Sequence, residues 1–91
     1  MDPYRLLYSA TSRQLIRNLH PNLKSTIRAR LKSLATDPYA GKPLERDLSG
    51  YYTLRAKRYR IIYKIDEAEH VIEIHYVGHR KDIYQLFKEK V

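Results

Sequence analysis

Histidine, arginine and lysine follow one another near the end of the chain, in the stretch YVGHRKDIY at residues 76–84. An apolar run ends at a glycine, His79, Arg80 and Lys81 come next, and Tyr84 follows four residues after Arg80. Imidazole can accept or donate a proton near neutral pH, guanidinium can bind two phosphate oxygens at once, and a phenol can donate a hydrogen bond or stack on a base. These residue types suit the binding or the cleavage of a phosphodiester.

A second group of cations comes earlier in the chain, at Arg55, Lys57, Arg58 and Arg60. Arg60 alternates with the apolar residues of its predicted strand, so its side chain should project from the opposite side. In an antiparallel meander the next strand lies beside this one, and that strand ends near His79. We therefore expect guanidinium groups, an imidazole and one or more phenols to gather on one concave face of the sheet.

Such a cluster could cleave RNA without a metal ion. In that reaction the 2′-hydroxyl attacks the adjacent phosphorus, which requires a base, cations for the phosphorane charge and an acid for the leaving 5′-oxygen. The same residues also fit simple phosphate binding, which composition alone favours over catalysis. We expect no cofactor and no metal, because the chain has no cysteine and its four histidines lack the spacings typical of metal sites.

Length and charge narrow the classes of function. The 91 residues predict one domain, residues 1–91, and the formal net charge of +8 favours a polyanionic partner, with nucleic acid ahead of an acidic protein or an anionic membrane. No stretch approaches the roughly 20 apolar residues that span a bilayer, so no membrane insertion is expected. Together with the absence of cysteine, this predicts a cytoplasmic protein.

The N-terminal half predicts one strand and a helical hairpin. Residues 4–8 alternate as in a short edge strand. Thr11 and Gln14 fit a capping box, which predicts a helix that starts at Thr11. Pro21 ends this helix and can begin a second one, which stops at residues 37–38. The second helix has an apolar stripe made of Leu23, Ile27, Leu31 and Leu34.

The C-terminal half predicts three antiparallel strands and a closing helix. An ordered surface loop over 39–50 precedes strands at 51–56, 59–65 and 71–77, and an acidic turn joins the last two. Asp82 can cap a short helix that turns Ile83, Leu86 and Phe87 inward. This order of elements predicts an α+β fold, in which the helical hairpin packs on one face of an antiparallel sheet.

Two stretches resemble a known family. Residues 41–66, GKPLERDLSGYYTLRAKRYRIIYKID, and residues 77–84, VGHRKDIY, are similar to the RelE/ParE superfamily of bacterial and archaeal toxins. The most specific pieces are the GKPL loop, the Arg55 position, the YRIIY strand and the terminal HRxDIY. The resemblance implies a compact microbial-RNase-like fold held inactive by an antitoxin. RelE-like members cut mRNA in the ribosomal A site without metal, whereas ParE-like members poison DNA gyrase.

The resemblance also implies roles for single residues. Arg60 matches the family arginine that stabilises the phosphorane, and Arg80 matches a second arginine that contacts phosphate. Arg55 matches a strand arginine next to the site. Tyr84 resembles the C-terminal tyrosine that stacks on or orients the substrate. Further candidate RNA contacts, from their charge and place in the chain, are Lys57, Arg58 and Lys81.

One departure leaves the general base unassigned. The best-known RelE members carry two lysines where this chain has Tyr51 and Thr53. His79 is the first candidate base, Lys57 the second and Tyr84 the third. Each also has a purely structural interpretation: His79 as the end of a strand that donates to a backbone carbonyl, Lys57 as an exposed turn residue, and Tyr84 as a core residue with its hydroxyl at the rim.

Three functions therefore stay open. The first is a ribosome-dependent mRNA endoribonuclease toxin, the second is a ParE-like inhibitor of DNA gyrase that acts without catalysis, and the third is a plain RNA-binding module. The last lacks support, because the chain has neither RNP-like aromatic motifs nor a GXXG loop. For either toxin the resemblance implies a cognate acidic antitoxin that covers the basic face and forms a hetero-oligomer with it; for the nuclease it implies the ribosome and mRNA as well.

Overall fold

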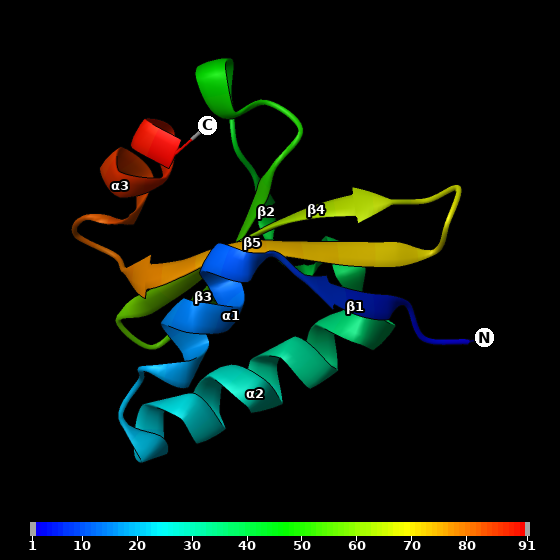
Figure 1. Ribbon diagram of the computed structural model, residues 1–91. Helices are drawn as coiled ribbons and strands as arrows, with labels where there is room; N and C mark the ends of the chain where they lie inside the picture. The colour runs from blue at the N-terminus through cyan, green and yellow to red at the C-terminus, as the bar shows by residue number, and fades with distance from the viewer. Residues whose placement is uncertain (1, 91) are drawn as a thin grey trace.

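The computed structural model of the protein describes residues 2–90 and has an α+β fold, as predicted (Figure 1). The strands are β1 (Arg5–Tyr8), β2 (Lys42–Pro43), β3 (Tyr52–Ala56), β4 (Tyr59–Asp66) and β5 (Val71–His79). The helices are α1 (Ala10–Arg17), α2 (Pro21–Thr36) and α3 (Ile83–Lys90), with two short 3₁₀ turns at Pro38–Ala40 and Arg46–Leu48. None of the helices within residues 2–90 combines the length and the apolar character needed to cross a bilayer.

The five strands form one sheet in the order β1-β5-β4-β3-β2. Strands β3, β4 and β5 make the predicted antiparallel meander, but β1 pairs with β5 in parallel, so the sheet is mixed. The alternation of residues 4–8 predicts the edge strand correctly, yet it contains no information on its direction relative to β5. Strand β2 lies within the predicted loop and pairs with Tyr52 and Thr53. Its Pro43 is tolerated because β2 is an edge strand.

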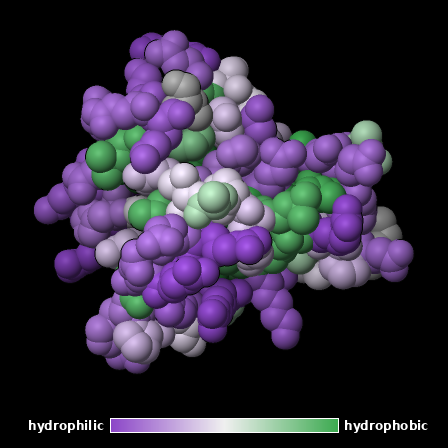
Figure 2. Space-filling view, viewed as in Figure 1, coloured by the Kyte–Doolittle hydropathy of each residue, from purple (hydrophilic) through white to green (hydrophobic). Residues whose placement is uncertain are grey.

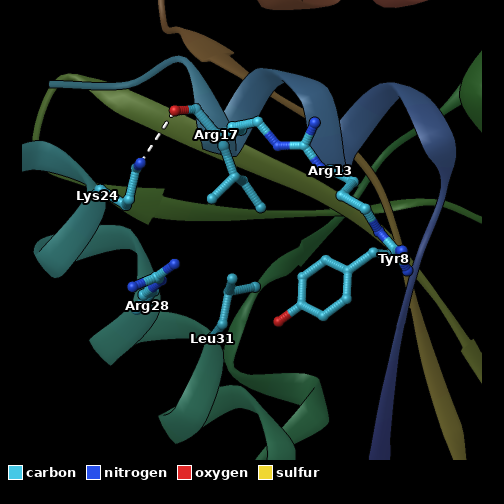
Figure 3. Close-up of a pocket in the computed structure, with 7 residues that line it drawn as sticks. Tyr8, Arg13, Arg17, Lys24, Arg28 and Leu31 are labelled. Carbon is cyan, nitrogen blue, oxygen red and sulfur yellow. Dashed lines mark hydrogen bonds between the residues drawn. The ribbon is translucent and has the colours of Figure 1, made fainter. Parts of the chain in front are cut away.

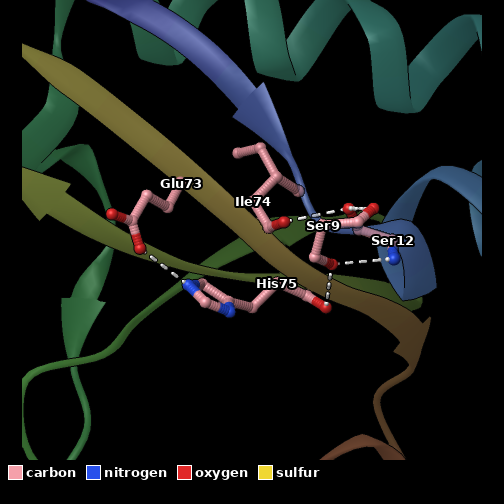
Figure 4. A network of polar contacts seen from close by, with 5 residues as sticks. All are labelled: Ser9, Ser12, Glu73, Ile74 and His75. Carbon is pink, nitrogen blue, oxygen red and sulfur yellow. Dashed lines mark hydrogen bonds and ion pairs between the residues drawn. The ribbon is translucent and has the colours of Figure 1, made fainter.

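The N-cap of helix α1 lies two residues before the predicted one, Thr11. The cap is Ser9, whose Oγ accepts a hydrogen bond of 3.0 Å from the backbone N–H of Ser12. The prediction of a capping box at Thr11 is therefore wrong. Ser9 is also held in place by β5, because its Oγ donates to the carbonyl of His75 at 3.1 Å (Figure 4). The fully buried Ser12 hydroxyl lies 2.9 Å from the carbonyl oxygen of Ile74. The start of α1 is thus fixed by β5, which a local sequence pattern does not reveal.

Helix α2 follows the prediction closely. Pro21 is its first residue, and it ends at Thr36, before the predicted Asp37-Pro38 stop. The Nδ1 atom of His20 accepts from the backbone N–H of Asn22 at 3.2 Å, which satisfies one of the free donors of the first turn. The predicted apolar stripe faces the sheet, since Ile27, Leu31 and Leu34 are buried.

Two hydrophobic cores lie on opposite faces of the sheet. The larger one joins α1 and α2 to the face of β4 that carries Ile61 and Tyr63. The smaller one lies under α3 and is formed by Leu48, Ile62, Tyr76, Ile83 and Phe87. The helical hairpin and α3 therefore cover different faces, which Figure 1 shows as separate layers. Ile62 of β4 belongs to the core under α3, and Arg60, two residues before it on the same strand, projects toward the same face of the sheet.

Candidate functional site

Arg55 and Arg60 are direct cross-strand neighbours on β3 and β4. Both line a groove of about 320 Å³ at the outer edge of β3, beyond the end of the short strand β2. The lining residues come from α2, the segment around β2, strands β3 and β4, and α3: Arg30, Ala40, Gly41, Lys42, Thr53, Leu54, Arg55, Arg60 and Tyr84. Four of these are cations and none is an acid, so the groove has the charge that a phosphate group needs.

The guanidinium of Arg60 is held by the backbone of its own turn. One of its terminal nitrogens donates to the carbonyl of Lys57 at 3.0 Å and to that of Tyr59 at 2.9 Å. A guanidinium has five N–H groups, so the Nε and the other terminal nitrogen keep three donors for a ligand. The two contacts fix the orientation of the guanidinium and leave its other N–H groups for a ligand.

Tyr84 reaches the same groove from α3. Its hydroxyl lies 3.2 Å from the Oγ1 of Thr53, and 36% of the residue is exposed. Thr53 occupies one of the two positions at which the chain departs from the lysine pair of the family that it resembles. The other, Tyr51, packs its ring against Phe87 and lies 4.7 Å from the Nζ of Lys64, so it belongs to the core under α3.

His79 does not join this group. In the β4–β5 register it lies opposite Tyr59, and the two rings pack edge to face with centroids 5.6 Å apart. The residue opposite Arg60 is Gly78. Because successive side chains of a strand alternate between faces, the prediction that the imidazole shares the face of Arg60 is wrong. The Nδ1 of His79 accepts from the N–H of Lys81 at 3.2 Å, so the neutral ring carries its proton on Nε2.

The remaining predicted cations lie at the same end of the sheet but do not line the groove. Lys57 and Arg58 form the tight turn between β3 and β4, with Lys57 at φ 56°. The backbone N–H of Arg80 donates to the carbonyl of Arg58 at 2.8 Å, which ties this turn to the end of β5. The side chains of Arg80 and Lys81 are exposed beside it.

Two cations of the groove, Lys42 and Arg30, were not among the predicted site residues. Lys42 lies opposite Thr53 in the β2–β3 pair, which places a cation next to the position that lacks the family lysine. Arg30 comes from α2, where its Nε donates to the carbonyl of Arg55 at 3.0 Å. Lys42 lies between a glycine and a proline in a stretch without periodicity, and Arg30 resembles any polar residue on a helix. Neither position gives a sequence signal.

The groove contains no group that would hold a metal ion. Across residues 2–90, no set of three or more His, Cys, Asp or Glu side chains is arranged to bind one. What the groove offers instead is guanidinium and ammonium groups, a threonine hydroxyl and a phenol. These groups can bind an oxyanion and donate hydrogen bonds to it.

Comparison with known proteins identifies the family of the chain. The family model for the ParE toxin of type II toxin-antitoxin systems (parDE) matches residues 7–84. The chain is 34% identical over 85 residues to Toxin RelG of Mycobacterium tuberculosis, which covers 91% of this chain and 98% of that toxin. It is 29% identical over 86 residues to Toxin RelE of the same organism, which covers 92% of this chain and 89% of that toxin.

Solved structures share the fold. The toxin–antitoxin complex RelBE2 of Mycobacterium tuberculosis contains a chain with a TM-score of 0.81 and 32% identity, covering 90% of this chain and 97% of that one. The isolated RelE toxin of E. coli has a TM-score of 0.71 at 20% identity, covering 96% and 97%, and at that identity it supports the fold alone. The chain belongs to the RelE/ParE family of toxins of type II toxin–antitoxin systems.

Proposed function

We propose that the protein is a ribosome-dependent mRNA endoribonuclease that inhibits translation without a metal ion. The observation that carries this proposal is the pairing of Arg55 with Arg60 in a groove that no carboxylate lines. Two adjacent guanidinium groups repel each other unless an anion lies between them, and a phosphodiester is the anion that their planar forks match best. Such a function would be exerted in the cytoplasm, where mRNA is translated.

In the proposed reaction the 2′-oxygen of one nucleotide attacks its own 3′-phosphorus. The bond from phosphorus to the 5′-oxygen of the next nucleotide breaks, which leaves a 2′,3′-cyclic phosphate and a free 5′-hydroxyl. The unused N–H groups of Arg60 donate to the non-bridging oxygens as their negative charge grows, and Arg55 supports them from β3. Fixed donors of this kind contribute about 10²–10³-fold to the rate of a reaction that develops an oxyanion.

The base and the acid have candidates in the groove and outside it. Tyr84 lines the groove and could hold the substrate base or a proton, while Lys42 adds an ammonium next to Thr53. Lys57, in the turn next to Arg60, and His79, which lies on the opposite face of the sheet, stay candidates outside the groove. The Nδ1 of His79 accepts from the N–H of Lys81, so the ring would have to give up this contact to act as a base through Nδ1. Arg80, Lys81 and Arg58 would contact the RNA strand on either side of the cut.

We also propose a cognate acidic antitoxin as the partner, with which this toxin forms a hetero-oligomer. The support is that similar structures were solved as toxin–antitoxin complexes, among them RelBE2 of Mycobacterium tuberculosis. A chain of net charge +8 would attract an acidic partner over long range.

The test is primer extension on a reporter mRNA in a translating extract, with naked RNA in parallel. We expect cuts in phase with codons in the translating sample alone, and their loss with Arg60→Ala. Lys32→Ala is the matched control, because Lys32 is an exposed cation of α2 that does not line the groove. Intact mRNA in every sample, with a folded protein that arrests growth, would overturn the nuclease.

A second candidate is a ParE-like inhibitor of DNA gyrase. The observation that favours it is the match of the ParE family model to residues 7–84, together with Tyr51 and Thr53 at the positions of the family lysines. A supercoiling assay with purified gyrase separates the two candidates. Inhibition of supercoiling that survives Arg60→Ala would support the ParE-like function.

A further inference from the structure

Most of the excess positive charge lies in the helical hairpin and not around the groove. Residues 3–36 contain seven Lys and Arg and not one Asp or Glu, whereas the rest of the chain is nearly balanced. The seven cations are Arg5, Arg13, Arg17, Lys24, Arg28, Arg30 and Lys32. In the space-filling view, the strongly hydrophilic side chains gather over α1 and α2 (Figure 2). A site for a polyanion is therefore to be sought on the hairpin as well.

Four of these cations surround one pocket between the two helices. Arg13 and Arg17 come from α1, and Lys24 and Arg28 come from α2 (Figure 3). The pocket measures about 400 Å³ and has Ile16, Leu31 and Tyr8 as its other lining residues. It is distinct from the groove at β3, with which it shares no lining residue.

The four charges are not neutralised within the protein. Both ion pairs formed among residues 2–90, His75 with Glu73 and Lys88 with Asp47, lie elsewhere. Arg13 and Arg17 are four residues apart on one helix, as are Lys24 and Arg28, and like charges at this spacing destabilise a helix. The one compensating contact within the pocket is from Lys24, whose Nζ donates to the carbonyl of Arg17 at 2.9 Å. An anion bound between the helices would relieve this repulsion.

Tyr8 adds a neutral donor to the pocket. Burial raises the pKa of its hydroxyl, and the charge of Arg28 offsets part of that rise. The hydroxyl therefore stays protonated at neutral pH and can donate to a ligand oxygen. A phenol also offers a flat surface on which a base can stack.

We propose that this pocket binds the phosphodiester backbone of RNA and acts as an anchoring site separate from the groove that contains Arg60. This inference rests on the proposed function for the identity of the polyanion. The pocket fits RNA better than an acidic protein, because its two core residues are nearly covered, with Ile16 8% exposed and Leu31 2%. The side chains that stay accessible around them are four cations and a phenol. Protein partners bind through buried apolar anchors, whereas nucleic-acid interfaces are polar and rich in positive charge.

Such a site would hold RNA without taking part in cleavage. Arg28 and Arg30 are two residues apart on α2, so they lie on opposite flanks of the helix; Arg28 faces the pocket and Arg30 faces the groove. A single strand that crosses α2 could therefore contact both sites. Binding at the pocket would raise the affinity for RNA and leave the chemistry at Arg60 unchanged.

The test measures binding of a labelled single-stranded oligouridylate over a range of salt concentrations. All proteins carry Arg60→Ala, so that binding is measured without cleavage. The pocket variant is Arg13→Gln with Arg28→Gln, and Arg17→Gln with Arg28→Gln is a second version in case the first folds poorly. The matched control is Arg5→Gln with Lys32→Gln, which removes the same charge from exposed residues of the same half of the chain outside the pocket.

We expect the pocket variant to bind more weakly than the control and to reduce the slope of log affinity against log salt by about 1.4, for two lost phosphate contacts. Equal effects of pocket and control variants would overturn the site and leave a diffuse electrostatic attraction. Binding of polyglutamate, a mimic of an acidic protein, is measured with the same variants. If the pocket variant binds RNA as the control does but binds polyglutamate more weakly, the RNA site is overturned in favour of an acidic protein. A reduced slope combined with no cleavage by the unaltered chain in the translating extract would support the site and reject the nuclease.

Discussion

The Nε of Arg30 on α2 donates a hydrogen bond of 3.0 Å to the backbone carbonyl of Arg55 on β3. Strand β2 pairs only with Tyr52 and Thr53, so beyond them the outer edge of β3 has no neighbouring strand. At Arg55 the side chain of Arg30 supplies the hydrogen-bond donor that a neighbouring strand would otherwise supply. The contact connects the helical hairpin to the strand position whose side chain enters the groove, and it makes Arg30 a positioning residue.

Replacing Arg30 should therefore loosen the edge of β3. We expect Arg30→Met to lower the free energy of unfolding by about 1 kcal/mol, since one hydrogen bond from a charged donor is lost while the carbonyl regains water. Lys32→Met, an exposed position on the same helix, should change it by less than about 0.5 kcal/mol. Urea unfolding of both variants measures the difference, and equal values would show that the contact does not stabilise the fold.

Tyr63 fixes the segment that carries Lys42. Its buried hydroxyl donates to the carbonyl of Pro38 at 2.7 Å and accepts from the N–H of Gly41 at 3.1 Å. Tyr63→Phe leaves both backbone groups without this partner, so we expect the free energy of unfolding to fall by about 1–3 kcal/mol. Tyr52→Phe is the control, because the structure gives its hydroxyl no hydrogen bond within residues 2–90 and its ring stacks on Tyr63. A loss as large in the control would contradict this role for the Tyr63 hydroxyl.

The same tyrosine predicts how stability depends on alkaline pH. Burial raises the pKa of Tyr63 to about 12, above its ordinary value of about 10. Between these two values the unfolded chain has lost the proton that the folded chain keeps, so stability falls as pH rises. Unfolding free energies measured from pH about 9 upward should decline toward pH about 12, and less steeply in Tyr63→Phe. Parallel curves for the two proteins would assign the decline to other groups.

The order of elements could be predicted because each rests on a local pattern. The stripe of Ile27, Leu31 and Leu34 and the alternation along β4 are repeated signals within one segment. The cap of α1 could not be predicted, because Thr11 and Ser9 both fit locally. The choice of Ser9 depends on the carbonyl of His75, which lies 66 residues away in the sequence.

The candidate site was predicted in part for the same reason. Alternation along β4 placed Arg60 correctly, and the resemblance to the toxin family supplied Arg55 and Tyr84, which line the same groove. His79 was placed on the wrong face, because its side depends on a register that pairs it with Tyr59. Lys42 enters the groove through pairing between distant segments, and no local pattern reports such pairing.

Two substitutions of Lys57 can separate the role of its backbone conformation from the role of its ammonium group. Its φ of 56° lies in the left-handed region, which costs a residue with a side chain about 1–2 kcal/mol and costs glycine nothing. Lys57→Gly and Lys57→Ala both remove the charge, but only glycine relieves the strain, so Lys57→Gly should be more stable than Lys57→Ala by about 1 kcal/mol in urea unfolding. The carbonyl of Lys57 accepts from Arg60, so the turn must keep its shape for the guanidinium to stay oriented. If the ammonium is the base, cleavage should fall strongly in both variants; if Lys57 acts through its carbonyl alone, Lys57→Gly should cleave nearly as well as the unaltered protein. Equal stability of the two variants would contradict the strain at this turn.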